Sequence, residues 1–186
     1  MPEPRPVFIA LEGLRGCGKS TIAPLLADKL GAQHIPTIPN EYNQARAFLD
    51  HHSRNVDARA HLFASALLIT AERVRAMLDA GTSVVIDSYM QRTIATHRAY
   101  GTTIDLTQPA DLPTPETFRL ECSAAERAAR LFQRKKAITW WDELADQLAD
   151  RIDLEYTRFP SQLVDTTDQQ PHETTAAVLA LLEQRH

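Results

Sequence analysis

The chain has 186 residues, 44% of them hydrophobic, which is enough for one α/β domain with a full core but not for two ordinary domains. The net charge of −4 and the lack of a continuous basic face argue against duplex nucleic acid as a partner. The two cysteines lack a metal-ligand spacing, which argues against both a zinc site and a disulfide framework. Without a signal core or a membrane-length apolar stretch, we expect a single cytoplasmic domain over residues 1–186 with no membrane contact.

The first predicted element is a strand at Val7–Leu11, which leads into Gly13–Ser20, a complete phosphate-binding loop of the pattern G-x-x-x-x-G-K-[ST]. Its glycines let backbone N–H groups point at phosphate oxygens, and the following helix brings its positive end to the same place. The pattern predicts that Lys19 reaches the β- and γ-phosphates of a nucleoside triphosphate and that Ser20 binds Mg²⁺. The residues expected around the phosphates are Gly13, Gly16, Cys17, Gly18, Lys19, Ser20 and Thr21. Cys17 is either a thiol whose pKa the helix N-terminus lowers or a small residue that fits the loop.

Helices and strands alternate after this loop. A first helix ends at Gly31, and a weak strand covers about residues 34–38. Apolar residues at three- and four-residue steps then predict a long helix over about residues 58–80, with Asp57 as its N-cap and Gly81 just beyond its end.

A short β-branched run, Val84–Ile86, ends at the carboxylate of Asp87 and is typical of a strand in a parallel sheet buried on both faces. The later predicted elements are a strand at 117–122, a helix from a Ser123 capping box to about 136, a helix from Thr139 to about 159, a strand at 162–165 and a helix at 173–184. This order predicts an α/β fold with right-handed crossovers, in which ligands bind outside the strand C-termini. We therefore expect the phosphate loop and Asp87 to meet there.

Several segments together resemble the thymidylate kinase family of P-loop kinases over most of the chain. These segments are Phe8–Gly13, Ala71–Arg73, Val84–Tyr89, Leu120–Arg134 and Val164–Thr166. The resemblance implies a P-loop NTPase fold with a five-stranded parallel sheet, flanking helices and a helical lid at about residues 130–145. It also implies ATP with Mg²⁺ as the phosphoryl donor and a possible homodimer.

The resemblance also implies site residues. Arg130 and Arg134 would belong to the lid over the phosphates, and Thr166 would lie beside the adenine. The residues assigned to the acceptor side are Glu12, Arg73, Ser88, Arg92 and His97. We interpret the adjacent Lys135 and Lys136 as ordinary basic residues at a helix C-terminus, and Trp140 and Trp141 as core residues.

The departures from the family pattern fall on the acceptor side. Arg15 stands where the family usually has an acidic residue that holds the sugar 3′-hydroxyl, and Ser88 stands where an arginine grips the acceptor's phosphate. The thymine-stacking aromatic corresponds to Ile69, and Ala95–His97 replaces an Ala-Tyr-Gln run. A hydroxyl acceptor needs a base, whereas a phosphate acceptor needs positive charge. The chain lacks the family's phosphate-binding arginine but keeps Asp87, so the sequence favours a hydroxyl group as the acceptor.

The sequence leaves two interpretations open for Asp87 and two for Arg15. Asp87 is either the base for an acceptor hydroxyl or a partner of Mg²⁺, and Arg15 either acts on the transferring phosphoryl group or binds an anionic group of the acceptor. Arg92 is a candidate replacement for the lost phosphate grip. The sequence thus predicts an ATP- and Mg²⁺-dependent kinase for a nucleoside or a similar small molecule. The alternatives are a nucleoside monophosphate kinase, such as a dTMP kinase, and a nucleotide-binding protein without catalysis.

Overall fold

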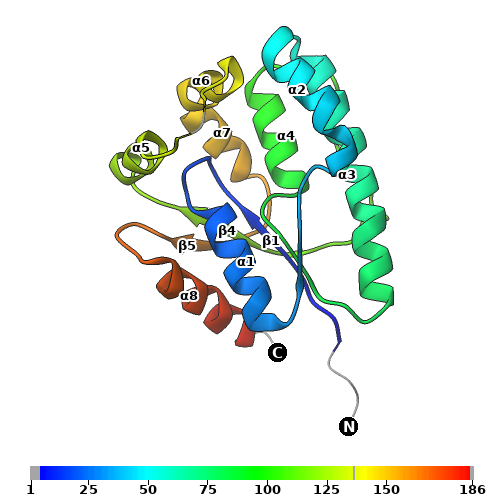
Figure 1. Cartoon of the computed structure of the whole chain (residues 1–186), viewed down its shortest axis with the longest axis vertical. Coiled ribbons are helices and arrows are strands. Elements are labelled where there is room, and N and C mark those ends of the chain that lie inside the picture. Colours follow the sequence, from blue (N-terminus) through cyan, green and yellow to red (C-terminus); the bar gives the residue numbers. More distant parts are fainter. Residues whose placement is uncertain (1–4, 136, 185–186) are drawn as a thin grey trace.

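A computed structural model describes residues 5–135 and 137–184 (Figure 1). Its five strands form one parallel sheet in the order β2-β3-β1-β4-β5. The strands are β1 (Phe8–Glu12), β2 (Gln33–Ile35), β3 (Val84–Ile86), β4 (Glu116–Glu121) and β5 (Gln162–Asp165). The expected α/β architecture with five parallel strands is confirmed.

Helices cover both faces of this sheet (Figure 1). They are α1 (Lys19–Leu30), α2 (Asn43–His52), α3 (Val56–Asp79), α4 (Met90–Ala99), α5 (Ala124–Phe132), α6 (Trp140–Gln147), α7 (Ala149–Tyr156) and α8 (Pro171–Glu183), with a short 3₁₀ turn at Asn40–Tyr42. None of the helices in the described ranges is long and apolar enough to cross a membrane.

Alternate residues of the central strand supply two separate cores, because successive side chains of a strand point to opposite faces. Phe8 and Ala10 pack in the core that includes residues of α3 and α4. Ile9 and Leu11 pack in the core that includes residues of α1 and α8. Helices on both faces thus hold β1 rigidly, and the phosphate loop begins at its carboxyl end.

Two predicted boundaries differ from the structure. The N-cap of α3 is Asn55, whose side chain accepts a hydrogen bond from the Ala58 N–H at 2.8 Å, so the prediction of Asp57 was wrong. Asp57 instead accepts hydrogen bonds from the hydroxyls of Thr102 and Thr103, both at 2.6 Å. The helix expected from Thr139 to about residue 159 is two helices, α6 and α7, because Leu148 leaves the helical conformation with φ −102° and ψ 18°.

The sequence analysis also missed α2. None of the residues in this helix is buried, so its apolar positions follow no core-facing stripe that a periodicity argument could detect. Lys136, within the expected lid, lies outside the described residues.

Candidate functional site

The phosphate loop follows directly from the carboxyl end of β1. Gly13 has φ +124°, and a Cβ at this position would lie 2.2 Å from the Leu120 carbonyl oxygen, so only glycine fits. The Lys19 ammonium donates hydrogen bonds to the carbonyl oxygens of Gly13 at 2.7 Å and Leu14 at 2.6 Å. Burial, with the charge of Arg92 as the next cause, lowers the pKa of Lys19 to about 7. The loop therefore holds a lysine with little access to water.

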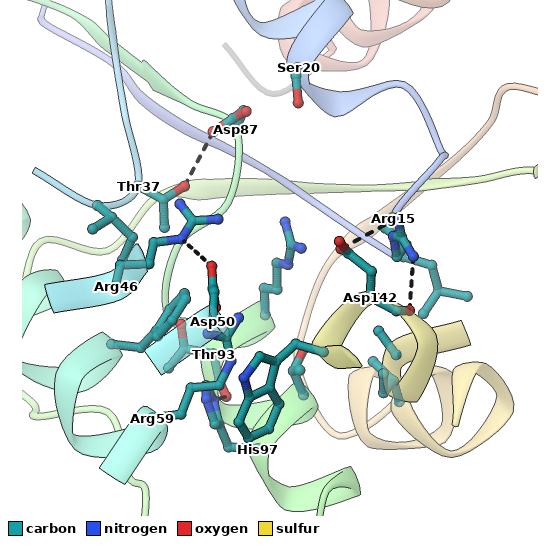
Figure 2. A pocket seen from close by; sticks show the side chains of 18 of the residues that line it. Arg15, Ser20, Thr37, Arg46, Asp50, Arg59, Asp87, Thr93, His97 and Asp142 are labelled. Carbon is teal, nitrogen blue, oxygen red and sulfur yellow. Dashed lines mark hydrogen bonds and ion pairs between the residues drawn. The ribbon is translucent and has the colours of Figure 1, made fainter. Parts of the chain in front are cut away.

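A cavity of about 500 Å³ opens beside this loop. It brings together Ser20 at the start of α1 and Asp87 after β3, as the strand-end argument predicted (Figure 2). The Thr37 hydroxyl donates to Asp87 Oδ1 at 3.2 Å. A hydroxyl and a carboxylate are oxygen ligands of the kind that Mg²⁺ accepts, so these residues fit a metal that is bound with a nucleotide.

Positive charge dominates the wall of this cavity. Six arginines line it, against three aspartates. The arginines are Arg15, Arg46, Arg59, Arg92, Arg127 and Arg134, and the aspartates are Asp50, Asp87 and Asp142. Guanidinium groups bind phosphate oxygens with two parallel hydrogen bonds, so the wall suits a ligand with several phosphates.

Arg15 connects the phosphate loop to α6 (Figure 2). Its Nη1 donates to the Asp142 carbonyl oxygen at 2.8 Å and pairs with Asp146 Oδ2 at 2.7 Å. The other carboxylate oxygen of Asp146 pairs with Arg127 at 3.1 Å. Asp146 thus ties together a loop arginine and an arginine of α5, and Arg15 does not simply point into solvent.

The two predicted lid arginines lie in different places. Arg134 lines the cavity, but Arg130 is absent from its wall. Arg130 donates to the Thr166 hydroxyl at 2.9 Å and to the Thr166 carbonyl oxygen at 2.7 Å. Arg127, which the sequence analysis missed, reaches the cavity instead. Arg127 lies three residues before Arg130, and residues three apart share a helix face, so this spacing could have indicated Arg127 as a further candidate.

Thr166, expected beside the adenine, lies behind the phosphate loop. It is 2% exposed, and its hydroxyl is 3.4 Å from the Cys17 carbonyl oxygen. Cys17 is itself buried, and its Sγ lies 3.7 Å from Cys122 Sγ. Burial raises the pKa of the Cys17 thiol to about 11, so the interpretation of a lowered pKa was wrong and Cys17 is a small residue that fits the loop.

Glu12, expected on the acceptor side, is fully buried and absent from the cavity wall. Its carboxylate accepts hydrogen bonds from the backbone N–H of Tyr89 at 2.9 Å and of Arg92 at 3.1 Å. Burial raises its pKa to about 7. Glu12 therefore holds the N-terminus of α4, the helix whose side chains line the cavity, and acts on the site through that helix.

Replacement of Glu12 by alanine is expected to destabilise the protein by about 2 kcal/mol, because one buried and one partly buried backbone N–H group lose their acceptor. The measurement is urea denaturation followed by circular dichroism. Glu72→Ala, at an exposed position of α3, is the matched control and should change stability little. Equal stability of the two variants would contradict the proposed capping role.

The remaining acceptor-side predictions have mixed outcomes. Arg73 is absent from the cavity wall. It pairs with Glu41 at 2.8 Å, and the two side chains are 46% and 65% exposed. Ser88 is buried, and its hydroxyl accepts from Arg92 Nη1 at 3.3 Å. Arg92 lines the cavity, as its prediction as a replacement for the lost phosphate grip requires.

His97 also lines the cavity and is 2% exposed. Its Nδ1 lies 2.7 Å from the Thr93 carbonyl oxygen, and the rings of Phe63 and Tyr100 lie 5.4 Å and 5.9 Å from its own. Burial, together with the charges of Arg59 and Arg92, lowers the pKa of His97 to about 4. The ring is thus neutral near pH 7.

The lowered pKa of His97 predicts a pH-dependent loss of stability. An unfolded histidine takes up its proton below pH 6.5, whereas the folded one resists until about pH 4, so stability is lost as the pH falls through this window. Between pH 7 and pH 4 the wild type should lose ~3 kcal/mol more than His97→Gln, which does not titrate. Urea denaturation at the two pH values measures this difference. Equal losses would contradict the burial of a neutral ring, and His172→Gln at an exposed position is the control.

The far end of the cavity contains residues that the sequence analysis missed or assigned elsewhere. Trp141, assigned to the core, is buried and donates its indole N–H to the Leu49 carbonyl oxygen at 3.2 Å, but it also lines the cavity. The Arg59 guanidinium carbon lies 4.4 Å from the Phe63 ring centre and 4.8 Å from that of Trp141. These side chains come from α3 and α6, which are far apart in the sequence, so no local sequence pattern predicts that they meet.

Comparison with known proteins gives a family match. The family model for thymidylate kinase matches residues 11–151. A thymidylate kinase from Desulfovibrio desulfuricans is 32% identical over 126 residues, which cover 62% of this chain and 58% of that protein, so less than two thirds of its length is spanned. A thymidylate kinase from Leptospira borgpetersenii is 26% identical over 155 residues, which cover 76% of each chain.

Solved structures share the fold. The structure of a thymidylate kinase from Candida albicans has a TM-score of 0.79 at 17% identity and covers 99% of this chain and 94% of its own. A deoxyadenosine kinase from M. mycoides with bound dATP has a TM-score of 0.72 at 15% identity and covers 95% of this chain and 99% of its own. At these identities the likeness shows the fold alone.

Proposed function

Because the chain belongs to the thymidylate kinase family of phosphotransferases, we propose that it transfers the γ-phosphoryl group of ATP to the 5′-phosphate of dTMP, giving dTDP and ADP. The sequence analysis preferred a nucleoside hydroxyl as acceptor and kept the monophosphate as an alternative. The family match and both curated relatives support the alternative.

The observation that carries the proposal is the arginine-rich wall. A triphosphate and a monophosphate that react together bring two anionic groups into one cavity, and their repulsion must be offset by cations. Six arginines on this wall against three aspartates supply them. A nucleoside acceptor would need less positive charge and a base.

Lys19 and four of the six arginines each have a role in the proposed reaction. Lys19 leaves the loop carbonyl oxygens and binds the β- and γ-phosphates, as the phosphate-loop lysine does in P-loop enzymes. Arg15, Arg127 and Arg134 neutralise the charge on the γ-phosphoryl group as it moves. Arg92 holds the 5′-phosphate of the acceptor, in place of the arginine that Ser88 has replaced.

The acceptor identity also decides between the two interpretations of Asp87. A phosphate oxygen of dTMP is already ionised at neutral pH, so it attacks the γ-phosphorus without a base. Asp87 and Ser20 would then hold Mg²⁺, which would supply positive charge to the donor phosphates.

Isothermal titration with a non-hydrolysable ATP analogue and Mg²⁺ present tests the proposal. We expect dTMP to bind at least tenfold more tightly than thymidine, about 1.4 kcal/mol, because only dTMP carries the 5′-phosphate that the arginines hold. Arg92→Ala should remove most of this difference, whereas Arg151→Ala, at an exposed position of α7, should preserve it. Equal affinities of the wild type for dTMP and thymidine would overturn the proposal.

A further inference from the structure

The chain's two cysteines face each other beneath the phosphate loop. Cys17 belongs to the loop, and Cys122 follows the last residue of β4, 105 positions further along the chain. The Cys122 thiol donates to Cys17 Sγ, and the two sulfur atoms lie 3.7 Å apart. Both thiols are free in the structure. Because a disulfide holds its sulfurs about 2 Å apart, only a short approach separates this pair from a covalent bond.

The two thiols differ in their access to solvent. Cys17 is 2% exposed, whereas Cys122 is only partly buried, so a dissolved oxidant meets Cys122 first. Burial raises the pKa of Cys17 to about 11, and its thiol therefore keeps its proton at neutral pH. An accessible thiol next to a second, resolving thiol is the arrangement in which oxidation stops at a reversible disulfide.

We infer that Cys122 is a modification site for hydrogen peroxide and that Cys17 converts the modified thiol into a disulfide. In the first step the Cys122 sulfur attacks one peroxide oxygen and the O–O bond breaks, which gives a sulfenic acid and one water. In the second step the Cys17 sulfur attacks the Cys122 sulfur and the S–O bond breaks. The hydroxyl leaves with the Cys17 proton as a second water. The two thiols together lose the two electrons that the peroxide gains.

The disulfide connects the phosphate loop to the start of α5. Cys122 directly precedes Ser123, the N-cap of α5, at the place where β4 leads into this helix (Figure 1). The loop already packs closely on α5, because a Cβ at Gly16 would lie 2.9 Å from Arg127 Cγ. Drawing the two sulfurs together therefore shifts the loop against the helix. A phosphate loop binds through backbone N–H groups at hydrogen-bond distance, so we expect this shift to weaken the binding of ATP.

Mass spectrometry of the reduced protein after treatment with hydrogen peroxide tests the chemistry. The wild type should lose about 2 Da, the mass of two hydrogen atoms, and yield a peptide pair joined through Cys17 and Cys122. Cys122→Ala keeps the Cys17 thiol and should yield no linked pair. A wild type that instead gains oxygen as sulfinic acid, or that forms disulfides only between molecules, would overturn the inference.

Isothermal titration with Mg²⁺ and a non-hydrolysable ATP analogue tests the consequence. The oxidised wild type should bind the analogue at least tenfold more weakly, because charge-assisted hydrogen bonds of the loop are lost. Dithiothreitol should restore the affinity of the reduced protein. Cys122→Ala should bind like the reduced wild type both before and after peroxide. Equal affinities of the oxidised and reduced wild type, or an equal loss in Cys122→Ala, would overturn the inference.

Both readouts are made without an acceptor, so they do not depend on the proposed function. A reduced wild type that makes no dTDP from dTMP would overturn the proposed function and leave the linked peptide pair as evidence for the modification site.

Discussion

Lys19→Ala is expected to lower kcat for phosphoryl transfer by about 10³-fold, or ~4 kcal/mol of transition-state stabilisation. The Lys19 ammonium is buried in the phosphate loop, where it donates to the carbonyl oxygens of Gly13 and Leu14. The variant should fold normally, because it removes a buried charge whose desolvation already lowers the pKa of Lys19.

Steady-state production of dTDP measures this loss, and thermal unfolding checks the fold. Lys29→Ala, in the exposed last turn of the same helix, is the matched control and should keep wild-type activity. Full activity of Lys19→Ala would show that the loop does not act on a phosphoryl group.

Arg15→Ala is expected to have the second-largest effect, a loss of about 10²- to 10³-fold in kcat with a smaller change in the KM for ATP. Arg15 projects from the phosphate loop into the cavity, so its guanidinium can meet the transferring phosphoryl group. In the structure Arg15 pairs with Asp146, which also pairs with Arg127.

Asp146→Asn separates the two possible reasons for that loss. If Arg15 acts on the phosphoryl group, weakening its partner leaves the guanidinium in place and kcat stays near the wild-type value. If Arg15 matters only because it anchors α6, Asp146→Asn lowers kcat together with Arg15→Ala. Parallel losses in the two variants would therefore contradict a catalytic Arg15.

The donor half of the site was predictable because its constraints are local. The positive φ of Gly13 and the start of α1 at Lys19 lie within one stretch of chain. The strand ending at Ile86 likewise delivered Asp87 to the predicted sheet edge, since parallel strands present their carboxyl ends together.

The acceptor half depends on contacts between distant segments, and sequence reasoning reached less of it. Glu12 and Arg73 were assigned to the cavity by resemblance, but one holds the N-terminus of α4 and the other pairs with Glu41. Arg59 of α3 meets Trp141 of α6 across the cavity, 82 positions further along the chain by their numbers, and no spacing rule links them. For the same reason, the sequence analysis did not predict that Cys17 Sγ lies close to Cys122 Sγ.

One competition measurement tests the central claim most directly. Wild-type protein, MgATP and equal concentrations of dTMP and isotope-labelled thymidine are incubated together. The products are identified by mass spectrometry at low conversion, where the label distinguishes dTMP made from thymidine from the dTMP supplied. The proposed function predicts dTDP as the product, with thymidine left unchanged. Conversion of thymidine to dTMP without dTDP would contradict it and would return Asp87 to the role of a base for an acceptor hydroxyl.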